Sequence, residues 1–126
     1  MGGSVKVFKT TSALWNNPAI APVVEQFKKY KNQMHVPTTF GRDAPLVRPS
    51  EAKYAGLQHI HLGVFNPINY QYSRTSDSWL IYATGFMNQN HFLLIDILSP
   101  DAHNKANSID LMNKYINLAS KFRETH

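Results

Sequence analysis

The 126-residue chain has no cysteine, which excludes disulfide bonds and thiolate metal ligands. No apolar run approaches the roughly 20 residues that a membrane-spanning helix needs. The opening Met1-Gly2-Gly3-Ser4 lacks the apolar segment of a secretory signal, and these four residues can be an artificial leader. We therefore expect a cytoplasmic protein without a membrane partner.

Acidic residues are few relative to basic ones. Eight Asp and Glu accompany 13 Lys and Arg, which gives a net charge of +5 and a pI near 9.6. The excess of basic residues lies in the first part of the chain. Residues 1–74 include nine basic and three acidic residues, whereas residues 75–126 include four basic and five acidic residues. A basic front half indicates a polyanionic or acidic partner, although an ordinary solvated basic surface explains it as well.

The segment from Gln58 to Phe65 alternates polar and apolar residues, a pattern typical of a half-buried strand. Successive side chains of a strand point to opposite faces. Ile60 is therefore expected to face the core together with Leu62 and Val64, while His59 and His61 share the other face. Two imidazoles on one strand face indicate the floor of a site.

The remaining pattern predicts one domain over residues 1–126, since 43% hydrophobic and 17% charged residues are typical of a folded chain. Three consecutive strands with short connections predict an antiparallel meander. We expect an α+β fold, with a small antiparallel sheet covered by an N-terminal and a C-terminal helix. Residues 32–55 are expected to be an irregular loop. The other expected elements are strands at 5–8, 78–85 and 91–98 and helices at 18–31 and 109–123. Asn17 and Pro18 are the start signal of the first helix, and Pro22 leaves a start near Ala21 as the alternative.

Several stretches, in this order along the chain, resemble the YafO toxins of type II toxin–antitoxin modules. The resemblance covers most of the chain from residue 40 onward, whereas the N-terminal third matches only loosely. The main stretches are Phe40-Gly41-Arg42-Asp43-Ala44, His59-Ile60-His61-Leu62, Tyr72-Ser73-Arg74-Thr75-Ser76-Asp77 and Leu80-Ile81-Tyr82, followed by Pro100, His103 and Ala119-Ser120-Lys121-Phe122-Arg123.

The resemblance implies a ribosome-dependent mRNA interferase, an endoribonuclease that cuts translated mRNA and is neutralised by an antitoxin. It also implies the compact fold of RelE-like toxins. The expected partners are thus mRNA, the ribosome and an antitoxin protein, and no cofactor or metal is expected.

RNA is cut without a metal when its 2′-hydroxyl attacks the adjacent phosphate, which requires a base, an acid and positive charge. Histidine suits the first two tasks because its ordinary pKa lies near neutrality. We expect His59 or His61 to be the base and His103 the acid. Arg74 is expected to bind the phosphate, and Asp77 to orient a histidine or hold Arg74.

Further RNA contacts are expected from residues beside these groups. Arg42 is a second candidate for the phosphate, and the hydroxyl residues Ser73 and Thr75, which flank Arg74 in the motif, are further candidates for RNA contacts. Tyr72 or Tyr82 can stack on an unpaired base, as aromatic residues do in single-stranded RNA recognition. A half-buried position in the sheet is the simpler interpretation of Tyr82.

Other interpretations of the candidate catalytic residues remain open at this point. Either His59 or His61 can be a structural residue with satisfied hydrogen bonds. Arg74 and Asp77 can form a local salt bridge that shapes the turn, and His103 can hydrogen-bond near a helix start. The chain would then be a non-catalytic RNA- or ribosome-binding domain. A metal-dependent hydrolase is a third alternative, with the two strand histidines and Asp77 or His103 as ligands.

Overall fold

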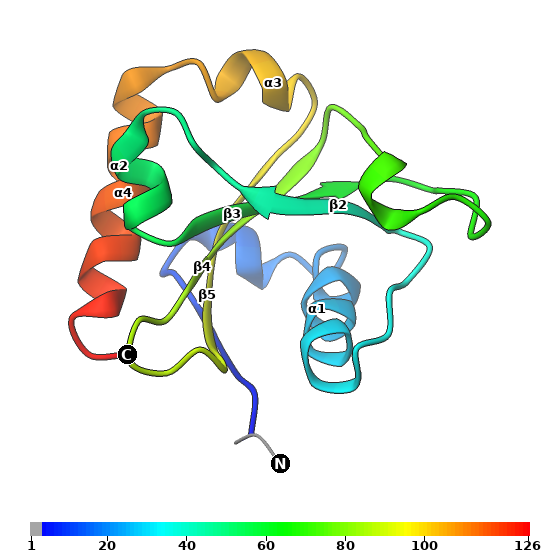
Figure 1. Ribbon diagram of the computed structural model, residues 1–126, viewed down its shortest axis with the longest axis horizontal. Helices are drawn as coiled ribbons and strands as arrows, with labels where there is room; N and C mark the ends of the chain where they lie inside the picture. Colours follow the sequence, from blue (N-terminus) through cyan, green and yellow to red (C-terminus); the bar gives the residue numbers. More distant parts are fainter. Residues whose placement is uncertain (1–3) are drawn as a thin grey trace.

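The computed structural model describes residues 4–126, so most of the leader expected at residues 1–4 lies outside the described residues. One five-stranded sheet has the spatial order β1-β5-β4-β3-β2 (Figure 1). Its strands are β1 (Lys6–Lys9), β2 (Phe40–Pro45), β3 (Leu57–Leu62), β4 (Trp79–Thr84) and β5 (His91–Leu98). The α+β class is confirmed, and β3, β4 and β5 form the antiparallel meander that the sequence predicts.

The expectation of a wholly antiparallel sheet is wrong at one edge. β1 pairs with β5 in parallel, with Lys6 opposite His91 and Lys9 opposite Leu94, which makes the sheet mixed. The alternation in Val5–Phe8 identifies a strand but carries no information about its partner, which lies some 85 residues further along the chain.

The second of the two long helices begins where its cap signal predicts, whereas the expected start of the first at Asn17 and Pro18 is wrong, because Asn17 ends a 3-10 turn and the helix begins at Ala21. α1 (Ala21–Gln33) has a proline in its first turn, where the missing N–H costs no hydrogen bond. α4 (Ile109–Arg123) begins after Ser108, whose hydroxyl accepts the Leu111 N–H. Figure 1 shows these helices on opposite sides of the strands. The remaining elements are α2 (Ser50–Tyr54), α3 (Ala102–Lys105) and the 3-10 turns η1 (Ala13–Asn16) and η2 (Gln71–Ser73).

The expectation of an irregular segment over residues 32–55 is wrong, because this segment contains β2 and α2. β2 is a short edge strand that ends in proline, and its pairing with β3 is interrupted between Phe40 and Asp43. A bulge destroys the alternation on which strand detection depends. Val64 is also placed differently from the expectation, since it follows the end of β3 and is 92% exposed.

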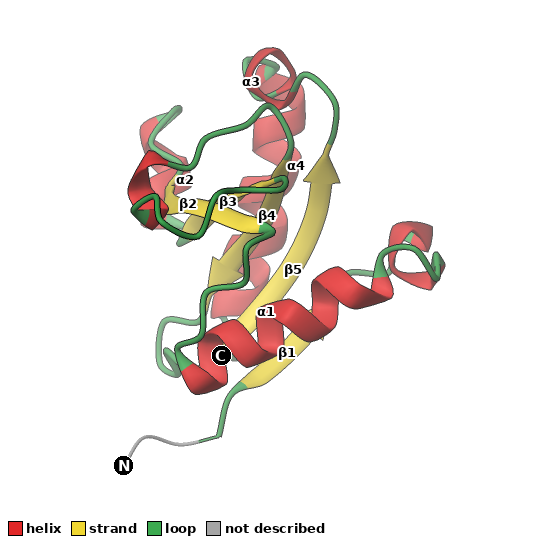
Figure 2. Ribbon diagram, turned by 90° about the vertical axis from the view of Figure 1, so that its right-hand side faces the viewer, coloured by secondary structure: helices red, strands yellow, loops and turns green. Residues whose placement is uncertain are grey.

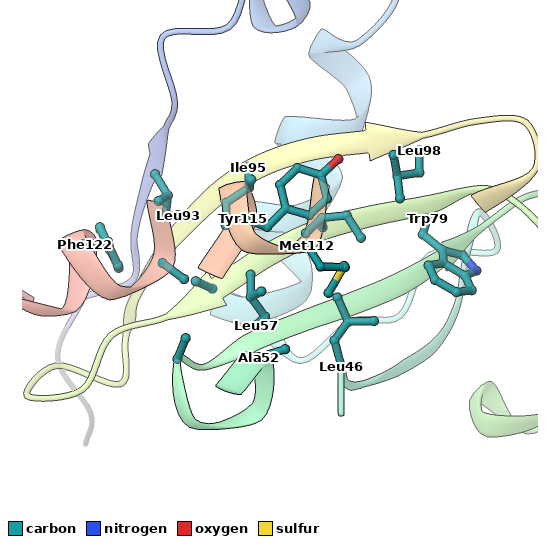
Figure 3. Close-up of a cluster of buried hydrophobic side chains, with 14 of the residues drawn as sticks. Leu46, Ala52, Leu57, Trp79, Leu93, Ile95, Leu98, Met112, Tyr115 and Phe122 are labelled. Carbon is teal, nitrogen blue, oxygen red and sulfur yellow. The ribbon is translucent and has the colours of Figure 1, made fainter. Parts of the chain in front are cut away.

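The core consists of two layers, one on each face of the sheet. On the α1 side, Phe27 and Tyr82 are fully buried with their rings 5.0 Å apart. On the α4 side, a longer cluster extends from Phe122 at one end to Trp79 at the other (Figure 3). Each fully buried large side chain contributes about 1.5–3 kcal/mol. β5 supplies residues to both layers, alternately from Phe92 to Ile95 and then past an irregularity in its pairing with β4, which explains its nearly continuous apolar sequence.

Figure 2 views the molecule from the side of α1, which lies in front of β1 and β5. The turn η2 belongs to the long connection between β3 and β4. Over residues 4–126 no helix combines the length and the apolar character needed to cross a bilayer.

Candidate active site

The two histidines of β3 lie on the sheet face that α4 partly covers, next to Trp79 of β4. The centroids of the His59 and His61 rings are 5.2 Å apart, and the Trp79 ring lies 4.5 Å from His59 and 5.5 Å from His61. His61 is 7% exposed, whereas His59 is half-buried. His103 of α3 approaches the same indole from outside, with 5.9 Å between the rings. Trp79 thus contacts all three histidines that the sequence predicts for the site.

Two backbone groups fix the orientation of the paired imidazoles. His59 Nδ1 lies 2.8 Å from the Ala44 carbonyl oxygen, which can only accept, so this nitrogen carries the proton. His61 Nδ1 lies 2.8 Å from the Ser76 amide, which can only donate, so the proton of its neutral ring is on Nε2. The Nε2 atom of His59 is therefore a proton acceptor, and that of His61 is a donor.

Burial and neighbouring positive charge keep both rings neutral. Burial lowers the pKa of His61 to about 4, and the nearby His59, Arg42 and His103 contribute in the same direction. Burial also lowers the pKa of His59, against the opposing effects of the Ala44 carbonyl and Asp43. At neutral pH, His59 is ready to accept a proton, while His61 can donate a hydrogen bond but is not an imidazolium acid.

The low pKa of His61 predicts a loss of stability on acidification. As the pH falls from about 6.5 to about 4, the unfolded chain binds a proton at His61 that the folded chain does not, so the free energy of unfolding falls in this window. We expect His61→Gln to remove about 1 kcal/mol of this pH dependence between pH 7 and pH 5, because solvent screening reduces the full effect. Urea unfolding at both pH values measures it, with the exposed His35→Gln as control. An identical pH dependence in wild type and His61→Gln would contradict the assignment.

Arg42 lies on the bulge of β2 and is oriented by Tyr72. Its Nε donates to the Tyr72 carbonyl oxygen over 2.7 Å, and its guanidinium carbon lies 4.0 Å from the centre of the Tyr72 ring. Within residues 4–126 no acceptor engages its two terminal nitrogens, which are left for an anion. Gly41 allows this arrangement, because a Cβ there would collide with the Arg74 carbonyl oxygen.

Three residues near Arg42 that the sequence predicts as RNA contacts are exposed. Tyr72 is 68% exposed and is held by its stacked guanidinium, so its other face remains open for a base. Ser73 and Thr75, which follow Tyr72 in the same segment, are also exposed. All three are retained as candidate RNA contacts.

Arg74 occupies a different place from the one expected. Its side chain is buried, and its guanidinium donates to the carbonyl oxygens of Phe40, Pro67 and Asn69 over 3.1–3.4 Å. These bonds fasten the β3–β4 connection to β2, so we reassign Arg74 from the phosphate to a structural role. A buried cation with three carbonyl partners is not available to a ligand.

Tyr82 is also removed from the expected RNA surface. It is fully buried on the α1 side of the sheet, the face opposite to His59, and its hydroxyl donates to Asp43 over 2.7 Å. A base cannot stack on a ring that is enclosed by the core. Its position agrees with the simpler interpretation of a sheet residue.

Asp77 neither orients an imidazole nor pairs with Arg74 among the described residues. Its Oδ1 accepts the backbone N–H of His103 over 2.9 Å, and its carbonyl oxygen accepts the Ala102 N–H. Asp77 therefore holds the start of α3 and places His103 indirectly, and we reassign it as a positioning residue. Residues 4–126 contain no group of three or more His, Asp or Glu side chains arranged like metal ligands.

Residues that the sequence did not single out complete the site. A cavity of about 410 Å³ opens beside His59, between the β2–α2 connection and α3. Ser76 and Trp79 orient the histidines. Trp79 lies on the α4 side of β4 together with Ile81 and Ala83. The register of β3 against β4 places Trp79 opposite His61, and the sequence does not reveal this register.

Comparisons with known proteins define the class. The sequence model described as "Toxin YafO, type II toxin-antitoxin system" matches residues 28–124, so the chain belongs to this family of toxins. It is 33% identical over 134 aligned residues to the mRNA interferase toxin YafO of Escherichia coli (strain K12), which covers 94% of this chain and 98% of that protein. No solved structure matches the chain.

Proposed function

We propose that this chain is an mRNA interferase toxin: a ribosome-dependent endoribonuclease that cuts translated mRNA, inhibits translation and is neutralised by an antitoxin. Membership of the YafO toxin family and the name of the E. coli relative support this proposal. The structural observation that carries it is the pair of neutral imidazoles with opposite free nitrogens, an acceptor on His59 and a donor on His61, near the open guanidinium of Arg42.

The reaction that suits these groups is attack of the ribose 2′-hydroxyl on its own 3′-phosphate. His59 Nε2 takes the hydroxyl proton as the bond from the 2′-oxygen to phosphorus forms. The bond from phosphorus to the 5′-oxygen then breaks, and His103 supplies the proton that this oxygen needs. The His61 Nε2–H and the terminal nitrogens of Arg42 stabilise the added negative charge on the phosphate oxygens.

This reaction needs no metal ligand and leaves a 2′,3′-cyclic phosphate and a 5′-hydroxyl. The ribosome is proposed as the partner that holds the message, with the exposed Lys28 and Lys29 of α1 as contacts for ribosomal RNA. We further infer a RelE-like fold and a cytoplasmic location, both from the family resemblance.

Primer extension on a translated message tests the function and its chemistry together. We expect cuts that require ribosomes, that persist with 1,10-phenanthroline at constant Mg²⁺, and that leave 5′-hydroxyl ends. A message with a single 2′-deoxynucleotide at the cut position should resist cleavage, because it lacks the attacking hydroxyl.

Binding to RNA or ribosomes without any cut would instead identify a non-catalytic binding domain. Cleavage of the 2′-deoxy message, or inhibition by phenanthroline, would contradict the 2′-hydroxyl mechanism.

A further inference from the structure

The cavity beside His59 has an apolar floor that is held rigidly. Trp79 and Leu46 are 6% and 8% exposed, and Val47 and Ala106 extend the apolar lining outward. The Trp79 indole is fixed because its Nε1 donates to the Ser76 carbonyl oxygen over 3.1 Å. Such a surface accepts a flat apolar group without rearrangement.

The rim of the same cavity is polar and carries only neutral or positive groups. Arg48, His103 and Asn107 contribute to it, and none of the nine lining residues, all within the described chain, is Asp or Glu. No residue between 4 and 126 forms a hydrogen bond or ion pair with the Arg48 guanidinium or the Asn107 side-chain amide. The cavity thus combines an apolar floor with an unpaired cation and an unpaired amide.

We propose that this cavity binds one unpaired nucleobase of the mRNA, next to the phosphate that is cut, and that Asn107 reads the edge of that base. This inference rests on the proposed function and assigns its base-recognition site. The floor takes the face of the base, the amide of Asn107 offers both a donor and an acceptor, and Arg48 contacts the neighbouring phosphate.

The position of His59 links the binding of the nucleobase to the cleavage reaction. His59 contributes to the wall of this cavity and is also the proposed general base for the 2′-hydroxyl. A nucleobase seated on the floor brings its own ribose to His59, while the phosphate lies toward His61 and Arg42. An acidic peptide would also find Arg48, but it would leave the flat floor and the Asn107 amide unused.

The two tryptophans of the chain provide a direct binding test, because only one of them is in the cavity. Trp15 lies in the α1-side cluster, on the opposite face of the sheet from Trp79. We titrate the four 2′-deoxy homodinucleotides, which cannot be cut, and follow both indole N–H signals by NMR. We expect a shift of the Trp79 signal that differs among the four bases, with the Trp15 signal unchanged.

Two variants and a matched control locate the interaction. Asn107→Ala should reduce the discrimination between bases about tenfold, both in this titration and in the base frequencies at mapped cut sites. Val47→Trp should fill the cavity and abolish the Trp79 response. Asn113→Ala, at an exposed asparagine of α4 away from the cavity, should leave both measurements unchanged.

The outcomes separate this proposal from the function on which it rests. Wild-type cuts with a base preference that Asn107→Ala and Val47→Trp both leave intact would overturn the cavity proposal and leave the nuclease proposal standing. A Trp79 response to an acidic peptide but to no dinucleotide would also overturn it. A base-dependent Trp79 response in a protein that never cuts would support the cavity and overturn the nuclease proposal.

Discussion

Replacing His59 by alanine is expected to lower the rate of mRNA cleavage by about 10²–10⁴-fold, the usual contribution of a positioned general base. The change removes the only imidazole nitrogen of the β3 pair that can accept a proton at neutral pH, since His61 Nε2 already carries one. Primer extension against a time course of a translated message measures the loss. The exposed His35→Ala serves as the matched control and should cut normally.

Rescue by a small molecule distinguishes a lost base from a damaged fold. The cavity beside His59 lets free imidazole reach the position of the missing ring, so added imidazole should restore part of the activity of His59→Ala. Added imidazole should not restore the activity of Arg42→Ala, because imidazole does not replace the guanidinium group that this variant lacks. A folded His59→Ala variant that cuts at the wild-type rate would remove His59 from the mechanism.

The acidic side of the pH–rate profile provides a second test of His59 as the general base. Because burial lowers the pKa of His59 below its ordinary value, the base stays unprotonated as the pH falls below 6.5. The fall in rate on the acidic side is therefore expected with a midpoint below 6.5.

Replacing Asp43 by alanine is expected to lower the free energy of unfolding by about 3 kcal/mol, because a partly buried network loses two hydrogen bonds to a charged group, each worth about 1.5–3 kcal/mol. The Asp43 carboxylate accepts the hydroxyls of Tyr30 and Tyr82 over 2.6 and 2.7 Å and lies 3.5 Å from Lys31 Nζ. Alanine at this position would leave the two tyrosine hydroxyls and the lysine ammonium group without the carboxylate that they contact on the α1 side of the sheet. A domain of this size has only about 5–15 kcal/mol of stability to lose.

Urea unfolding at neutral pH measures this effect, with Glu25→Ala as the control. The Glu25 carboxylate also binds a lysine, Lys28 over 3.4 Å, but both side chains are largely exposed and the pair is worth at most about 1 kcal/mol. Equal losses from Asp43→Ala and Glu25→Ala would show that the network does not stabilise the fold. The network also accounts for the position of Lys31 Nζ, which lies 5.0 Å from the centres of the Tyr30 and Tyr82 rings.

Periodicity and end signals in the sequence are sufficient for the elements with strong local patterns. The meander of β3, β4 and β5 and the extent of α4 follow from alternation, short connections and the Ser108 cap. The shared face of His59 and His61 follows from the two-residue repeat of a strand. The family resemblance is confirmed by the match to YafO toxins.

Contacts between segments that are distant in the sequence decide which of the predicted site residues a ligand can reach. Arg42 and Arg74 are two residues of the same type in matching motifs, and the sequence favoured Arg74 for the phosphate. The structure buries Arg74 among three carbonyl groups from Phe40, Pro67 and Asn69 and leaves the terminal nitrogens of Arg42 open. Which cation a ligand can reach depends on burial, and burial is a property of the assembled fold.

The sequence by itself determined the central meander, the last helix and the face on which the two histidines lie, because each of these depends on residues that are neighbours in the chain. It also determined the family, through the order of several short motifs along the chain. Only the tertiary structure decided the parallel position of β1, the enclosure of Tyr82 and the convergence of Ala44 and Ser76 on the histidine rings. The open nitrogens of His59 and His61 differ because one backbone carbonyl and one backbone amide, each 15 residues away in sequence, reach them from different segments.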